Sequence, residues 1–267
     1  MATITASVVN ELRNKTGLGM MECKKMLTET GGDIGKAIDE FRKKGVKASI
    51  MERAATEGRV EVVTQGSTAA AVEVVCNTDF TAKSDQVQAV AKSAAEALAG
   101  NAGADLTANA AIKDALTTVS QVTGENVQLG RSATVTGNVG SYLYSTAGKG
   151  KIGVLMQFSQ PAPEEVVKSL GMHIAAARPV ALTRADVPQD LIAKEREIAV
   201  EQAKQTGKPQ NIAEKIAEGK LNSFYSERVL LDQEFVNTDV FKGTVAAMLK
   251  AKGLELTKYV RLEVGQA

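Results

Sequence analysis

Apolar residues recur at helical spacing in the first 44 residues, where polar and glycine interruptions predict three short helices. Thr5 is placed to cap the first helix and Gly17 to end it. The second is expected from about Met20 to Glu29, and Asp33 would cap the third. A chain of about 40 residues is near the lower limit for independent folding. Residues 1–44 are therefore predicted to form a small appended three-helix module.

From residue 58 the pattern changes to the apolar runs of strands. Runs over 59–65 and 69–76, separated by Gly66-Ser67-Thr68, predict a hairpin. Two helices, near 87–98 and 108–122, and a strand from 123 to 135 are expected to follow. Residues 58–138 are predicted to form a first core subdomain.

The order strand-turn-strand-helix then recurs. Val139–Tyr144 and Ile152–Phe158 predict a second hairpin, and a helix begins at Pro163. A closing helix and a last strand are expected near the end, over Thr244–Lys252 and Glu255–Val264. The sequence thus predicts an α+β fold with two subdomains, each a small antiparallel sheet covered by helices, the second built from residues 139–186 and 228–267.

Residues 187–227 are charged and helical, with a turn at Gly207-Lys208-Pro209. Their thin apolar seam predicts a projecting antiparallel, coiled-coil hairpin. The seam residues are Leu191, Ile198, Ile212, Ile216 and Phe224. Residues 45–57 are interpreted as a solvated linker that continues the basic run Arg42–Lys47; a ribosomal or RNA contact is the alternative.

Charge and composition narrow the function. Lys and Arg (32) nearly balance Asp and Glu (31), which argues against a broad nucleic-acid footprint. With no Trp and 4% aromatics, a base-stacking platform is not expected. Neither signal peptide nor apolar run of 18 residues is found, so we expect a cytoplasmic protein without membrane contact.

Candidate chemistry is sparse. Cys23 and Cys76 are in no CxxC spacing and there is one His, so no metal site or cofactor is expected. His173 is interpreted as a structural side chain, because no nucleophile or acid accompanies it. Gly17-Leu18-Gly19 and Gly148-Lys149-Gly150-Lys151 lack the full phosphate-loop motif. We therefore expect no catalytic residue and no nucleotide bound by this chain, and predict that it is not an enzyme.

One junction stands out. The apolar run Ala69–Cys76 predicts a buried strand that ends in polar residues and is followed directly by Asp79 and Phe80. In the simplest interpretation, Phe80 is a core residue at the start of a helix and Asp79 is its N-cap. Alternatively, an acid beside an aromatic at such a junction suits a probe inserted into another protein.

Several segments resemble elongation factor Ts in collinear order. They are Leu12–Leu27 with Gly31-Gly32-Asp33-Ile34, Asn77–Lys83, Thr123-Gly124-Glu125-Asn126, Gly207-Lys208-Pro209 with Ile212–Ile216, and Leu230–Val236. The departures from the family pattern are Met26, Gly130-Arg131-Ser132, Glu234 and Tyr144, where a His is frequent in the family. The C-terminal helical module of some members is also expected to be missing, since the chain stops at Ala267.

The resemblance implies a guanine-nucleotide exchange factor for the GTPase elongation factor Tu, with an N-terminal module similar to ubiquitin-associated domains. It implies that Phe80 enters an apolar pocket between helices of the GTPase domain, flanked by Thr78, Asp79 and Thr81. Moving those helices would disturb the Mg²⁺ site and release GDP.

The resemblance also implies that Met20 and Met21, with Leu12 and Arg13 nearby, hold the module on the GTPase domain. In the alternative interpretation, Met20 and Met21 fill the core of the three-helix module. Neighbours on a helix are about 100° apart, so at least one of them should be exposed.

Two rival functions stay open at this stage. A scaffolding module would bind a partner without accelerating GDP release, and an α+β enzyme would need an acid/base or metal set that the sequence does not offer. The oligomeric state is open too, because the family's hairpin and core can mediate self-association into a homodimer.

Overall fold

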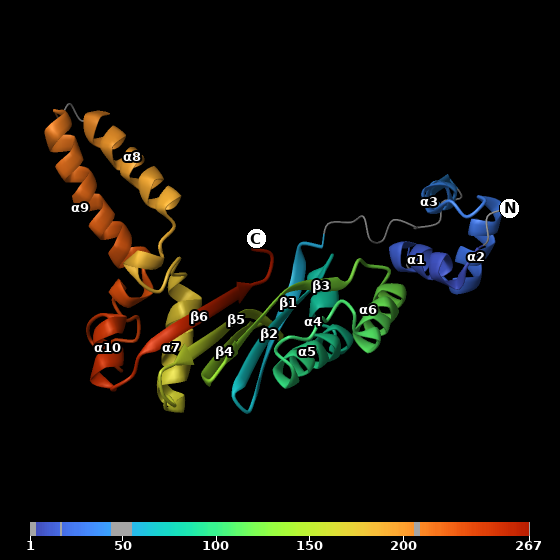
Figure 1. Cartoon of the computed structure of the whole chain (residues 1–267), viewed down its shortest axis with the longest axis horizontal. Helices are drawn as coiled ribbons and strands as arrows, with labels where there is room; N and C mark the ends of the chain where they lie inside the picture. Colours follow the sequence, from blue (N-terminus) through green and yellow to red (C-terminus); the bar gives the residue numbers. More distant parts are fainter. Residues whose placement is uncertain (1–3, 17, 44–54, 206–208, 267) are drawn as a thin grey trace. The chain divides into compact units, whose positions relative to one another are not determined.

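The computed structural model describes residues 4–16, 18–43, 55–205 and 209–266 (Figure 1). Helices and two small antiparallel sheets alternate along the chain, which confirms the predicted α+β class. The predicted linker 45–57, apart from its last three residues, lies outside the described residues, as do Gly17 and the Gly207-Lys208 turn.

Two compact units make up the chain: residues 1–134, 143–153 and 262–267 form one, and residues 135–142 and 154–261 form the other. The helices are α1 (Ala6–Thr16), α2 (Met20–Glu29), α3 (Ile34–Lys43), α4 (Asp79–Lys83), α5 (Asp85–Gly100), α6 (Ala110–Thr123), α7 (Glu164–Ala177), α8 (Gln189–Gln205), α9 (Gln210–Arg228) and α10 (Val245–Ala251). The strands are β1 (Glu57–Gln65), β2 (Thr68–Cys76), β3 (Gln128–Thr136), β4 (Asn138–Thr146), β5 (Lys149–Phe158) and β6 (Leu256–Glu263), and two 3₁₀ turns are η2 (Arg184–Asp186) and η3 (Leu230–Asp232).

Helices α1–α3 pack around a core of their own. The two expected caps are present: Thr5 Oγ1 accepts from the Val8 N–H over 3.4 Å, and Asp33 Oδ1 accepts from the Lys36 N–H over 3.0 Å. The core residues come from all three helices: Val9, Leu12, Cys23, Met26, Leu27, Ala37 and Phe41. The three-helix pattern was thus predicted correctly.

The sheet β1-β2-β3 carries helices α5 and α6 (Figure 1). Alternate residues of β2 face these helices, as the two-residue period of a strand requires. They are Ala70, Val72, Val74 and Cys76, and they share one buried cluster with Val87, Val90, Ala94 and Leu98 of α5 and Ile112 and Val119 of α6. This packing fixes the end of β2, from which the next segment leaves.

The second sheet has the order β4-β5-β6, and α7 packs against it. At Gly171 the helix approaches the sheet so closely that a Cβ would lie 2.3 Å from Tyr142 Cβ. Only glycine is tolerated at such a distance.

Helices α8 and α9 form the expected hairpin, but its seam differs from the prediction. Ile198 and Ile212 are exposed, and four of the five buried residues in the described part of this hairpin are alanine. The five are Ala199, Ala203, Ala213, Ala217 and Leu221. Small side chains let the two helices approach closely, so the larger aliphatic residues are left at the edges of the contact.

Candidate protein-binding site

The segment after β2 is a five-residue helix with a hydroxyl at each end. Thr78 is the N-cap of α4, and its side chain accepts from the Thr81 N–H over 3.3 Å. Ser84 ends α4 and caps α5 by accepting from the Val87 N–H over 3.3 Å. The sequence predicts a helix near residues 87–98 and a helix start at Phe80, and the structure has two helices here, divided at the Ser84 cap.

Phe80 lies in the first turn of α4 and is 89% exposed, more than any other large hydrophobic side chain in the described part of the chain. Its neighbours Thr81 and Ala82 are buried and attach the helix to the body of the unit. Successive side chains on a helix diverge by about 100°, so burying these two turns Phe80 outward. The interpretation of Phe80 as a core residue is therefore wrong.

Asp79 is not the N-cap, which corrects the simplest interpretation of this residue; Thr78 takes that position. Asp79 instead pairs with two lysines. Its Oδ2 lies 2.5 Å from Lys83 Nζ, and its Oδ1 accepts from Lys149 Nζ. Hydrogen bonds from Lys149 and then Lys83 lower the pKa of Asp79 to about 2. The carboxylate beside Phe80 is thus charged and held in place.

Lys149 belongs to Gly148-Lys149-Gly150-Lys151, the turn that partly matches a phosphate-loop motif. Its Nζ also lies 3.0 Å from Glu57 Oε2. Burial alone would lower the pKa of Lys149, but the hydrogen bonds with Asp79 and Glu57 outweigh it and raise the pKa. The ammonium group is therefore engaged by two carboxylates of the protein itself.

Glu125 secures the other side of the junction. Its Oε1 accepts from Thr78 Oγ1 over 2.6 Å, and its Oε2 accepts from the N–H groups of Thr78 and Asn77 over 3.0 and 3.1 Å. Burial raises the pKa of Glu125, but the bonds from Thr78, Thr81 and the two amides outweigh it and lower the pKa. Asn77 Oδ1 in turn accepts from the Asn126 N–H over 2.7 Å.

Sequence reasoning missed Glu125 and Lys149 as functional candidates. The Thr123–Asn126 turn carries only the family resemblance, and Lys149 lies in a turn that lacks the full phosphate-loop motif. A signal was present for each: an acid in a turn that the resemblance covers, and a lysine between two glycines at a hairpin. Only the fold brings both of them to residues 77–79.

The second group of candidates lies on the N-terminal module. Met20 is 50% exposed and Met21 is 76% exposed, because Cys23, Met26 and Leu27 fill the inner face of α2. Both Met residues therefore lie at the surface, and the core-filler interpretation is wrong. Arg13 is half-buried, whereas Leu12 is fully buried in the module core, so its side chain packs the module instead of lying on its surface.

His173 is structural, as expected. It is fully buried and stacks on Phe235 at 5.5 Å between ring centroids. Its Nδ1 accepts from the Val236 N–H over 3.2 Å, so the proton is on Nε2, which donates to Gln233 Oε1 over 3.0 Å. Burial lowers the pKa of His173 and the bond to Gln233 only partly opposes this. The imidazole is therefore held neutral.

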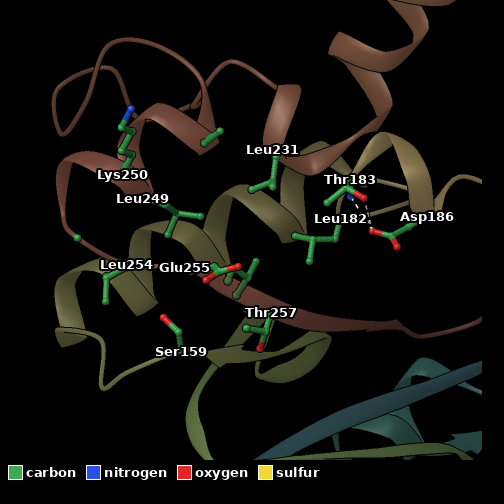
Figure 2. Close-up of a pocket in the computed structure, with 13 residues that line it drawn as sticks. Ser159, Leu182, Thr183, Asp186, Leu231, Leu249, Lys250, Leu254, Glu255 and Thr257 are labelled. Carbon is green, nitrogen blue, oxygen red and sulfur yellow. Dashed lines mark hydrogen bonds between the residues drawn. The ribbon is translucent and has the colours of Figure 1, made fainter.

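A groove of about 690 Å³ opens in the second unit (Figure 2). Leucines from several elements line it, among them Leu182, Leu231 and Leu249. Two carboxylates line it, of which Asp186 is already engaged, since it accepts from the Thr183 N–H and Oγ1 over 2.9 and 2.6 Å. No His or Cys is among the lining residues. The other charged lining residues are Glu255 and Lys250.

The described residues offer neither a membrane span nor a metal-binding cluster. None of the helices combines the length and apolar composition that a membrane crossing needs. Within the same residues, no three His, Cys, Asp or Glu side chains are gathered as a metal ion would require. The outstanding feature of the described surface is the exposed Phe80 on the short helix α4, which hydrogen bonds and ion pairs hold in place.

An exposed aromatic of this kind, together with two surface methionines on a separate small module, is typical of a protein that binds other proteins. Comparison with known proteins identifies its family. The Elongation factor TS family model matches residues 77–266. Elongation factor Ts of Psychrobacter sp. strain PRwf-1 is 40% identical over 278 residues, covering 100% of this chain and 92% of that protein. Elongation factor Ts of Ruegeria pomeroyi is 42% identical over 275 residues, covering 98% and 93%. The chain belongs to the elongation factor Ts family, which acts in protein biosynthesis.

Proposed function

We propose that this chain is a guanine-nucleotide exchange factor that binds elongation factor Tu with GDP and promotes GDP release, so that GTP can load during translation elongation. Membership of the elongation factor Ts family supports the general function. The single observation that carries the role of the site is the 89% exposure of Phe80 on a helix whose base is fixed.

In this proposal Phe80 inserts into an apolar pocket between helices of the GTPase domain. Thr78 and Asp79 flank it at the surface, and the buried Thr81 supports it from below. A buried aromatic anchor commonly contributes about 2–4 kcal/mol to an interface, measured as the cost of truncation. An exposed Phe on a fixed base gains this energy without first being ordered, since its backbone is already held.

Exchange follows from the charge of the bound metal. Mg²⁺ is the dominant local charge of a nucleotide site, so moving helices that support it weakens the hold on the GDP phosphates. Linkage requires the reverse effect as well: GDP weakens binding of this chain to the GTPase by the same factor. In this scheme the chain makes no covalent bond and acts only on the conformation of the GTPase. We propose that it does so in the cytoplasm, where translation proceeds.

The N-terminal module, residues 1–44, would supply affinity. Exposed methionines suit an adaptable contact surface, because the thioether side chain is flexible and polarizable. Met20 and Met21 would form this contact with Arg13 at its margin, while Leu12 would maintain the core beneath them. Two core subdomains are assigned to residues 58–138 and to residues 139–186 with 228–267. The helical hairpin is assigned to residues 187–227.

Stopped-flow release of a labelled GDP from elongation factor Tu tests the proposal. Phe80→Ala should lower the saturating release rate at least tenfold, in line with the loss of an anchor of this size. Val240→Ala is the matched control, since Val240 is 48% exposed in the second unit. Circular dichroism should show both variants folded. An unchanged rate with Phe80→Ala would sink the role given to Phe80.

The rival function is scaffolding. It predicts tight binding to the GTPase and no acceleration of GDP release at any concentration of this chain. Measuring affinity and release rate in the same preparation therefore separates the two functions.

A further inference from the structure

We propose that Lys149 is a positioning residue for Phe80: it holds α4 at the angle from which the aromatic ring can be inserted. The inference rests on the proposed exchange function and extends it to a residue that does not itself lie at the exposed surface. The Lys149 side chain is only 9% exposed, yet its ammonium group contacts the carboxylate adjacent to Phe80.

Four charged groups make up this contact. Lys149 pairs with Asp79 and with Glu57 (3.0 Å), and Asp79 pairs also with Lys83 (2.5 Å). Two acids thus face two bases, and the cluster is neutral as a whole. Lys149 is its most buried member, so its pairs are screened less by salt than exposed pairs.

A helix as short as α4 cannot fix its own direction. Isolated helices below about 12–15 residues are marginal in water, and α4 has five residues. Its orientation must come from attachments to the rest of the unit: the buried Thr81 and Ala82, and two polar attachments at its N-terminal end. Glu125 supplies one attachment, through Thr78 and the Asn77 amide. Lys149 supplies the second, through Asp79, from a different part of the chain.

Lys149 can do this because the backbone that carries it is itself seated. The next residue, Gly150, lies so close to β1 that a Cβ there would be 2.0 Å from the Val60 carbonyl oxygen. The preceding Gly148 takes a left-handed conformation, φ +81°. The two glycines therefore have a structural reason: they allow a lysine to enter β5 directly beside β1 and reach α4.

The experiment has two readouts. The first is the ¹⁹F spectrum of 4-fluorophenylalanine placed at position 80 in the full chain without partner. Lys149→Met, which keeps the length of the side chain and removes its charge, should shift and broaden the signal, and Lys149→Arg should restore it. Lys83→Met is the control for charge loss at the exposed side of Asp79 and should change the signal less.

The second readout is GDP release from elongation factor Tu as a function of exchange-factor concentration. Lys149→Met should lower the saturating rate by about tenfold while changing the half-saturating concentration little, since misplacement of an acting group by about 1 Å is costly. In the background of Phe80→Ala the same substitution should cause no further loss, because Lys149 acts through Phe80.

The outcomes separate the two proposals. Identical ¹⁹F spectra for the wild-type chain and Lys149→Met, or additive losses in the double variant, overturn the positioning role. A changed spectrum together with normal release by Phe80→Ala supports the positioning role and overturns the role of Phe80 in exchange.

Discussion

The hydroxyl of Thr78 donates to Glu125 Oε1 over 2.6 Å and so ties the end of β2 to the turn that precedes β3. The same carboxylate accepts from two consecutive backbone amides. A single side chain therefore satisfies donors that would otherwise be left open where a strand gives way to a helix. Phe80 can be exposed on an ordered backbone because the Glu125 carboxylate holds the residues that precede it.

Removing the carboxylate should loosen the junction. Glu125→Ala is expected to lower the free energy of unfolding by about 1–3 kcal/mol, since hydrogen bonds to a charged acceptor are lost and two amides must find water. Urea unfolding followed by circular dichroism measures this. Glu96→Ala removes an exposed carboxylate whose pair with Lys92 spans 3.9 Å, and it should change the value by less than about 0.5 kcal/mol. Equal effects of the two substitutions would contradict the bracing role.

Asp79 gives the chain an acid-sensitive element. Its pKa is lowered from 3.8 to about 2 in the folded state, so its pairs stabilise the fold above pH about 4 and this contribution is lost as the pH falls toward 2. The melting temperature of the wild-type chain should therefore drop over this window more steeply than that of Asp79→Asn. If the melting temperatures of the wild-type chain and Asp79→Asn fell equally between pH 5 and 2, the lysines would not hold the carboxylate.

His173 offers a cleaner titration because the chain has one histidine. Burial lowers its pKa below 6.5, so the unfolded chain binds the proton more readily than the folded chain. Stability from this residue is complete above pH 6.5 and declines as the pH falls toward the folded pKa, by at most about 1.4 kcal/mol per pH unit. His173→Asn should be less stable at pH 7.5 and lack this slope between pH 7 and 5, as urea midpoints would reveal.

Met20 and Met21 should set the affinity of this chain for the GTPase without changing the rate of GDP release in the complex. Replacing both by Ser is expected to raise the half-saturating concentration in GDP release about tenfold, while the saturating rate stays near that of the wild-type chain. Lys24→Ser, at another exposed position of α2, serves as the control. A fall in the saturating rate instead would place the module in the release step.

Much of the fold could be predicted from local pattern. Thr5 and Asp33 are predictable as helix caps because capping requires a short oxygen-bearing side chain at a fixed offset, and both accept the expected amide. Strand and helix alternation over residues 58–158 followed from period alone. The identity of the hairpin seam did not, because alanines carry little apolar signal even where they form the contact.

The site was half predictable. An acid and an aromatic at the end of a buried strand pointed to residues 79 and 80, but local pattern favoured a core Phe and an Asp cap. Burial of Thr81 and Ala82 decides the direction of Phe80, and that burial depends on packing between elements far apart in the sequence. The partners Glu125 and Lys149 are 46 and 70 residues from Asp79, and no periodicity spans such a distance.

Because α4 is defined by its ends, residues 77–84 amount to a transferable cassette. The hydroxyls of Thr78 and Ser84 set where the helix begins and stops, and the sequence between them adds one protruding ring. A host scaffold would need to provide a carboxylate beneath Thr78, an ammonium group beside Asp79 and a surface that buries Thr81 and Ala82. Grafting this loop would then present an aromatic side chain in a defined direction on an unrelated fold.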